Sequence, residues 1–142
     1  MLQEMLRPIG INLEIEIMER GAWNEKVLTN TDYELCMWAV PITVLDADFA
    51  AYGPFHSENR GGSGNFSNCN IPEIDELVEK GRVTPPGEER NEIYRRFCEI
   101  IRDECVVVPF LAARRELPAR ANLKGLSANP TMRYYIYDAY WE

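Results

Sequence analysis

Hydrophobic and polar residues follow two different periods along this chain, and each period predicts a different kind of element. Over residues 11–18, isoleucine or leucine fills every second position and polar residues fill most of those between, which predicts a β-strand. Residues 33–40 predict a second strand, and the continuous apolar run within it, from Leu35 to Val40, is typical of a strand that is buried on both faces. The apolar run over residues 106–111 predicts a third strand, also buried.

Apolar residues three or four positions apart predict four helices. The first stops at residues 8–10 and contains only the last turns of a helix; the second ends before residue 30. The third begins near Pro72, with Asn70 as its N-cap, and the fourth covers residues 84–104. Their apolar stripes are, in order, Leu2, Met5 and Leu6; Trp23, Val27 and Leu28; Ile74, Leu77 and Val78; and Ile93, Phe97, Ile100, Ile101 and Cys105.

The rest of the chain is predicted to be irregular or extended. Residues 41–70 contain prolines and a glycine-rich stretch, which predict a long irregular connection of a kind that often serves a function. Residues 121–127 and 134–141 are predicted to be extended or turn-rich. Helices and strands thus succeed one another in an α/β order, which predicts a mixed sheet flanked by helices. The first helix lacks a start and the last segment is rich in tyrosine, so we expect a part of a larger body.

Composition excludes some classes of partner. The chain has 142 residues, enough for one domain, and a formal net charge of −8. That charge argues against binding to nucleic acid and to anionic lipid. No apolar run reaches about 18 residues, so we expect no membrane-spanning segment, and no signal peptide is recognisable at the start.

The four cysteines and the single histidine do not form a metal-binding pattern. No Cys-x-x-Cys pair occurs, so a structural zinc site is not expected. Cys98 and Cys105 lie seven positions apart on a predicted helix, about 10 Å between Cα atoms, which is too far for a disulfide. A bridge between Cys36 and Cys69 stays open. The simpler expectation is four small buried side chains.

Seven short motifs in a fixed order resemble a known family. They cover nearly the whole chain: Leu6-Arg7-Pro8-Ile9-Gly10-Ile11; Trp23 with Asp32-Tyr33-Glu34-Leu35; Asn65-Phe66-Ser67 with Pro72-Glu73-Ile74-Asp75-Glu76-Leu77; Glu88-Glu89-Arg90 with Tyr94; Val107-Val108-Pro109-Phe110; Leu123-Lys124-Gly125-Leu126; and Asp138-Ala139-Tyr140-Trp141. In this order they resemble the bacterial extracellular solute-binding proteins of family 5, which serve peptide and nickel ABC importers.

The resemblance implies a fold, a role and a place in the cell. The fold would be part of a type II periplasmic-binding-protein-like lobe. Residues 1–120 would form a C-terminal solute-binding lobe that is incomplete at its N-terminus, and residues 121–142 would be closing strands that return toward a missing N-terminal lobe. Such a protein captures an oligopeptide or a peptide-like compound in the periplasm or outside the cell. It delivers the solute to the transmembrane permease, catalyses nothing and needs no cofactor. A lipid anchor on the full-length protein would fit the same role.

The resemblance also implies where the solute lies. It points to the end of the strand at Trp38 and the loop after it, and ligands of α/β sheets favour such strand ends. An indole there can stack on a ligand or on a cation. The expected solute-contacting residues are Trp38, Ala39, Val40, Pro41, Asp46, Asp48, Phe49 and His56.

The chain departs from the family where peptide-binding members carry an aspartate. About three residues after the tryptophan, that carboxylate pairs with the α-amino group of the peptide, but positions 39–42 here carry no acid. A buried ammonium without a partner is costly. Either Asp46 reaches round, or the solute is a sugar, an opine-like compound or a metal chelate. His56 alone makes a poor metal site, so no metal is expected.

Two other classes stay as alternatives. Asp46 and Asp48 are compatible with a hydrolase that uses paired acids, although no nucleophile motif accompanies them. A free-standing interaction domain would need no second lobe, and it would be a monomer without exposed apolar surface.

Overall fold

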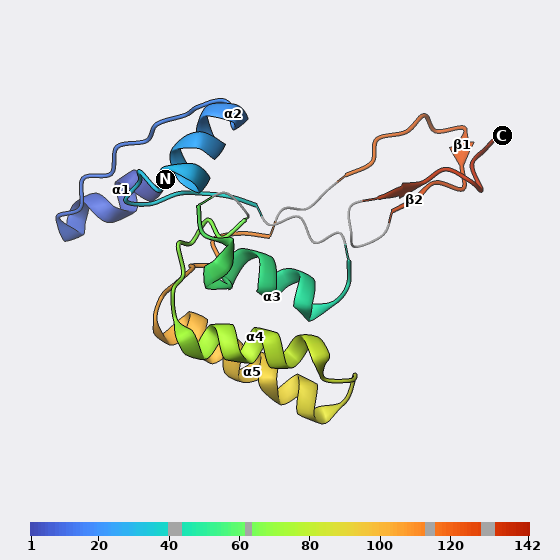
Figure 1. Ribbon diagram of the computed structural model, residues 1–142. Helices are drawn as coiled ribbons and strands as arrows, with labels where there is room; N and C mark the ends of the chain where they lie inside the picture. Colours follow the sequence, from blue (N-terminus) through green and yellow to red (C-terminus); the bar gives the residue numbers. More distant parts are fainter. Residues whose placement is uncertain (40–43, 62–63, 113–115, 129–132) are drawn as a thin grey trace.

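Three helices form the centre of the protein. The computed structural model describes residues 1–39, 44–61, 64–112, 116–128 and 133–142. Helix α4 (Pro72–Val83) lies between α3 (Ala47–Phe55) and α5 (Glu88–Asp103) and contacts both (Figure 1). A short 3-10 helix, η3 (Ser57–Asn59), follows α3. The helices predicted from Pro72 and over residues 84–104 are confirmed, the second with a later start at Glu88.

The hydrophobic core lies between these three helices. Ile74 and Val78 on α4 are completely buried, and the Phe55 ring from α3 meets the edge of the Phe97 ring from α5, with centroids 5.3 Å apart. The rest of the core cluster consists of Ala51, Cys69, Ile100 and Ile101. The predicted apolar stripes of the last two helices therefore face one another, with one exception. Cys105 is exposed, because α5 ends at Asp103 and Cys105 adopts a positive φ of 50° beyond it.

Helix α4 illustrates how local chemistry sets the ends of an element. Pro72 occupies its first turn, where no backbone N–H donor is needed. Glu73 and Asp75 lie near its N-terminus and Lys80 and Arg82 near its C-terminus, so the charges complement the helix dipole. The predicted cap at Asn70 is wrong, because the N-cap position falls on Ile71, which makes no side-chain cap.

The first part of the chain forms two short helical segments. Helix α1 (Leu2–Leu6) runs into a 3-10 turn, η1 (Arg7–Ile9), and Gly10 ends it with a φ of 82°. Helix α2 (Arg20–Trp23) continues as a π-helical turn, η2 (Asn24–Thr29). Both helices predicted for this region are confirmed.

The three strands predicted over residues 11–18, 33–40 and 106–111 are wrong for this structure. Residues 11–18, 33–39 and 106–111 have no regular secondary structure, and residue 40 lies outside the described residues. Their apolar side chains are largely exposed, among them Ile15, Ile17, Leu35, Val108 and Leu111. A strand forms only when a neighbouring strand takes its backbone hydrogen bonds, and the described residues supply none for these segments.

Short antiparallel ladders replace the expected mixed sheet. Strand β1 (Leu123–Lys124) pairs with β4 (Tyr140–Trp141), and β2 (Ser127–Ala128) pairs with β3 (Tyr134–Tyr135). Gly125 suits the turn after β1, since its φ is 75° and a Cβ there would lie 1.9 Å from the Asp138 carbonyl oxygen. Extended structure in these two regions is confirmed. The assignment to a type II lobe stays a prediction.

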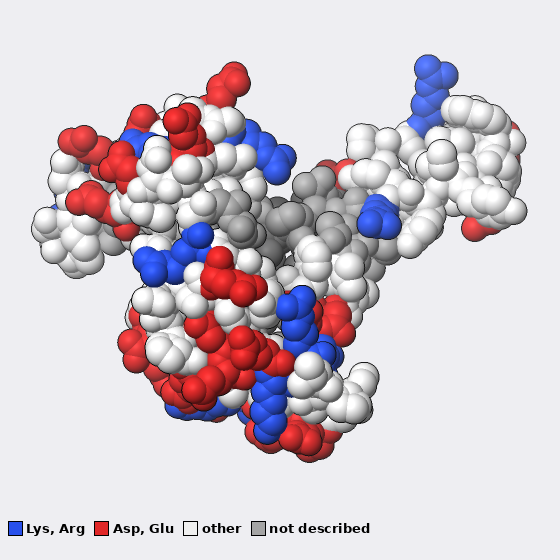
Figure 2. All heavy atoms as spheres, viewed as in Figure 1, with Lys and Arg blue, Asp and Glu red and all other residues white. Residues whose placement is uncertain are grey.

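The β-strands form an arm that projects away from the central helices (Figure 1). Few charged side chains cover the visible face of this arm, whereas both signs of charge crowd the central helices (Figure 2). Its aromatic residues are exposed, Tyr137 almost completely. None of the described helices is long and apolar enough to cross a membrane.

Candidate functional site

The predicted irregular connection contains a helix, and that helix builds a groove. Helix α3 begins where the Asp46 side chain accepts a hydrogen bond from the Asp48 N–H at 2.8 Å, which caps it, so the prediction of an irregular segment is wrong here. One side of α3 lines a groove of about 370 Å³. Two predicted residues line it, and the described residues that line it are Asp48, Phe49, Tyr52, Gly53, Pro54, Gly64, Phe66 and Arg82.

The charged groups in this groove, Arg82 and Asp48, contact each other or a neighbouring ring. The Arg82 guanidinium lies 3.8 Å from the centroid of the Tyr52 ring, a cation–π contact. Its Nε is 3.5 Å from Asp48 Oδ1, an atom that is buried and accepts no hydrogen bond within the described part of the chain. The groove is therefore an aromatic surface on which the guanidinium of Arg82 already has the Tyr52 ring and the Asp48 carboxylate as partners.

Asp46 is held by Arg90. The Asp46 carboxylate accepts two hydrogen bonds from the Arg90 guanidinium, at 2.6 and 3.2 Å, and Arg90 also donates to the Gly81 carbonyl at 2.9 Å. Hydrogen bonding to Arg90 is the main cause that lowers the pKa of Asp46, and the Asp48 N–H adds to it. The same contact raises the pKa of Arg90. For Asp46 to reach a solute ammonium, it would have to give up this bidentate pair and its cap.

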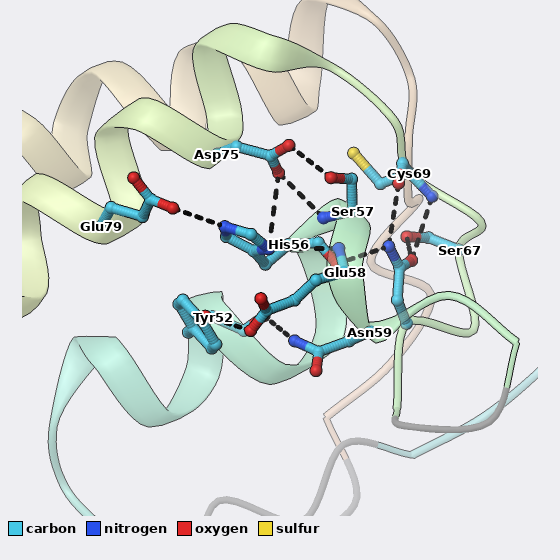
Figure 3. Close-up of polar contacts among 10 residues, drawn as sticks. Tyr52, His56, Ser57, Glu58, Asn59, Ser67, Cys69, Asp75 and Glu79 are labelled. Carbon is cyan, nitrogen blue, oxygen red and sulfur yellow. Dashed lines mark hydrogen bonds and ion pairs between the residues drawn. The ribbon is translucent and has the colours of Figure 1, made fainter.

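His56 lies in a covered polar cluster at the C-terminal end of α3, on the side that faces α4 (Figure 3). The ring is 5% exposed and stacks on Tyr52 with centroids 4.5 Å apart. Its Nε2 is 3.2 Å from Glu79 Oε1, and its Nδ1 accepts a hydrogen bond from the Glu58 N–H at 3.2 Å. Both ring nitrogens thus have protein partners, and a solute would have to displace one of them to reach the ring.

The same cluster contains a serine, a histidine and an aspartate, but not in a hydrolytic arrangement. The Ser57 hydroxyl donates to Asp75 Oδ2 at 2.5 Å, and the Ser57 N–H donates to Asp75 Oδ1 at 2.8 Å. A nucleophilic serine needs its hydroxyl against an imidazole nitrogen that takes its proton. In Figure 3 no dashed line joins the Ser57 hydroxyl to the imidazole, and the line from His56 toward this pair ends on Asp75, whose Oδ1 lies 4.0 Å from Nδ1. Among the described residues, no three metal-ligating side chains lie close enough to hold an ion.

Asn65 ties the glycine-rich loop to the end of α3, a role that sequence reasoning missed. Its side chain is 2% exposed and makes four hydrogen bonds. The amide donates to the carbonyls of His56 and Cys69 at 3.1 and 2.9 Å, while its oxygen accepts from the Cys69 N–H and the Ser67 hydroxyl. The available signal was its place in a sequence motif, which did not distinguish a structural amide from a ligand contact.

Trp38 is not among the residues that line the groove. It belongs to a small surface that we call the Trp38 platform, made of Trp38, Trp23 and Arg20. The two indoles stack with centroids 4.4 Å apart and planes 19° from parallel. The Arg20 guanidinium carbon lies 5.5 Å from the Trp38 ring centroid. Trp38 is still 37% exposed, and Ala39 beside it is also exposed. Val40 and Pro41 lie outside the described residues.

All four cysteines are free thiols, so the bridge left open between Cys36 and Cys69 is absent. Cys69 is buried, and that burial is the main cause that raises the pKa of its thiol. Cys98 and Cys105 are exposed and line a second groove of about 380 Å³ beside α5, so the expectation of four buried cysteines is wrong for them.

Comparison with known proteins adds no relative. No protein-family model matches the chain, and a search of the curated proteins finds no significant match.

Proposed function

We propose that the chain belongs to the substrate-binding component of an ABC importer, which captures a small peptide-like solute outside the cytoplasmic membrane and delivers it to the permease. The proposal rests on the ordered motifs of the sequence. The observation that carries it is the Trp38 platform. Trp38 is large and rigid, it is held in place by Trp23, and more than a third of its surface is open to a ligand. Exposed aromatic anchors of this kind contribute much of the energy in binding sites.

The three unpaired apolar segments support the same proposal. Single exposed apolar side chains are ordinary, but here several lie close together in each segment, and two of the segments flank the platform in sequence. A second lobe that packs against residues 11–17 and 35–37 would cover these runs and supply the missing strand partners. The solute would then be held between that lobe and Trp38.

The groove beside α3 is the weaker place for the solute. The Arg82 guanidinium stacks on Tyr52 and lies near the Asp48 carboxylate, so a charged ligand would have to separate these existing contacts. We therefore assign the solute to the platform, and we assign Asp46, Asp48 and His56 to holding α3 in position.

The test is native mass spectrometry of the protein as its host makes it. The proposal predicts a bound, non-covalent mass of a few hundred daltons that is released unchanged when the protein unfolds. A protein that carries no small molecule, and that acquires none when it is mixed with an extract of its own growth medium, would contradict the proposal. A bound compound that the protein converts chemically over hours would indicate an enzyme instead.

A further inference from the structure

The charged groups around Trp38 indicate which kind of solute the platform accepts. We infer that Arg20 and Trp38 together select a solute that presents a carboxylate next to a planar group, with no free ammonium at that end. This inference rests on the proposed function and narrows it to a class of solute.

The first step concerns the acids that follow Trp38 in the sequence. Positions 39–42 carry no carboxylate in the sequence. Asp46 is the first acid after Trp38, and it is bound to Arg90 by two hydrogen bonds and caps α3. Asp46 therefore offers no free carboxylate to an ammonium at Trp38, and an ammonium that loses its water without a partner of opposite charge is costly.

The second step is that the platform carries a cation. The Arg20 guanidinium lies 5.5 Å from the Trp38 ring, and it is exposed. Within the described ranges, no carboxylate lies at ion-pair distance from it. Lys26, the nearest lysine in sequence, is by contrast paired with Glu16 at 2.6 Å, so the free cation on this surface is Arg20.

The third step is geometric. A guanidinium has a planar fork that matches a carboxylate with two parallel hydrogen bonds, and Arg20 keeps this fork available while its carbon lies near the indole. A solute whose carboxylate lies next to an amide or another flat group fits both features at once. The flat group lies against Trp38, and the carboxylate reaches Arg20.

Two peptides with the same two side chains and different ends separate the alternatives. N-acetyl-alanyl-phenylalanine has a free carboxylate and no ammonium, whereas alanyl-phenylalanine amide has the ammonium and no carboxylate. Each is titrated by calorimetry into the host-made protein after its own solute has been removed. The inference predicts at least tenfold tighter binding of the acetylated peptide, because a charge-assisted hydrogen bond is gained in one case only.

Variants then assign the preference to Arg20. Arg20→Gln should reduce the preference to less than about threefold, while Arg20→Lys, which keeps the charge and loses the fork, should keep part of it. Arg102→Gln is the matched control, since Arg102 is an exposed arginine on α5 that pairs with its neighbour Asp103, and it should leave the preference unchanged. All three variants should melt within a degree or two of the original protein.

The outcomes separate the inference from the function it rests on. Tighter binding of the amide, or a preference that survives Arg20→Gln, overturns the assignment of Arg20 and of the solute class while solute binding stands. If neither peptide binds but native mass spectrometry finds a bound compound, the inference is also wrong and the function stands. If no compound is found at all, both fall.

Discussion

Truncation of Phe97 is the sharpest test of the three-helix core. Phe97 is 7% exposed and its ring packs edge-to-face on Phe55 at 5.3 Å. An aromatic pair of this geometry adds about 0.5–1.5 kcal/mol beyond the burial of its area, and a buried phenylalanine replaced by alanine also leaves a cavity. We therefore expect Phe97→Ala to lower the free energy of unfolding by about 3–5 kcal/mol.

The assay is urea denaturation followed by far-ultraviolet circular dichroism, which reports the helices. A domain of this size has a total stability of about 5–15 kcal/mol, so Phe97→Ala removes much of it and Phe97→Leu serves as a milder variant that should lose about 1–2 kcal/mol. Phe110→Ala is the matched control, because Phe110 is 44% exposed and its removal leaves no cavity. Equal losses for Phe97→Ala and Phe110→Ala would show that α3, α4 and α5 do not share the core described above.

Three further predictions follow from polar contacts and thiols. Asn65→Ala should cost about 2–4 kcal/mol in the same urea experiment, because it leaves buried backbone groups of His56 and Cys69 without partners; a cost below about 1 kcal/mol would contradict this. The pKa of Asp46 is lowered by Arg90, so its stabilising contribution is present above the unfolded-state pKa of about 3.9 and is lost as the pH falls through the lower folded-state value; Asp46→Asn should therefore flatten the decline of melting temperature below about pH 4, and an unchanged decline would refute the linkage. With a thiol reagent at pH 8, Cys98 and Cys105 should react first and Cys69 only on unfolding, since burial raises the pKa of the Cys69 thiol; rapid labelling of Cys69 in peptide mapping would contradict its place in the core.

The helices could be predicted because their signals are local. Helical spacing of apolar residues fixed the buried face of α5, and Pro72 marked the start of α4. Helix α3 was missed because its composition, with Gly53 and Pro54 inside it, is typical of a loop. What makes it a helix is the cap at Asp46 and the packing of Ala51 and Phe55 against α4, and the second of these depends on contacts distant in sequence.

The strands were predicted wrongly for a related physical reason. The alternation over residues 11–18 predicts which side chains would share a face if a strand formed, but it does not predict that the strand forms. A strand also needs a partner, and the described chain offers none to Ile11, Ile15 and Ile17. Under the proposed function, these segments are the surface on which a second lobe would pack.

The predicted role of Trp38 as a solute contact stays a prediction, although its exposure is compatible with that role. The sequence could not show that Asp46 is bound to Arg90, 44 positions away, or that His56 is enclosed by Glu79 and Tyr52, because such pairings follow from how the helices pack. It also gave no sign that Arg20 would lie beside Trp38, 18 positions later.

The most direct test of the account compares two aromatic residues as anchors for the solute. The measurement is calorimetric titration of the solute that the host-made protein releases, into Trp38→Ala and into Phe49→Ala, which removes an exposed aromatic wall of the groove. The account predicts that Trp38→Ala weakens binding by about 1–3 kcal/mol, or about 5- to 150-fold, while Phe49→Ala changes it less than about twofold. Full affinity in Trp38→Ala together with a large loss in Phe49→Ala would place the solute in the groove and contradict the account.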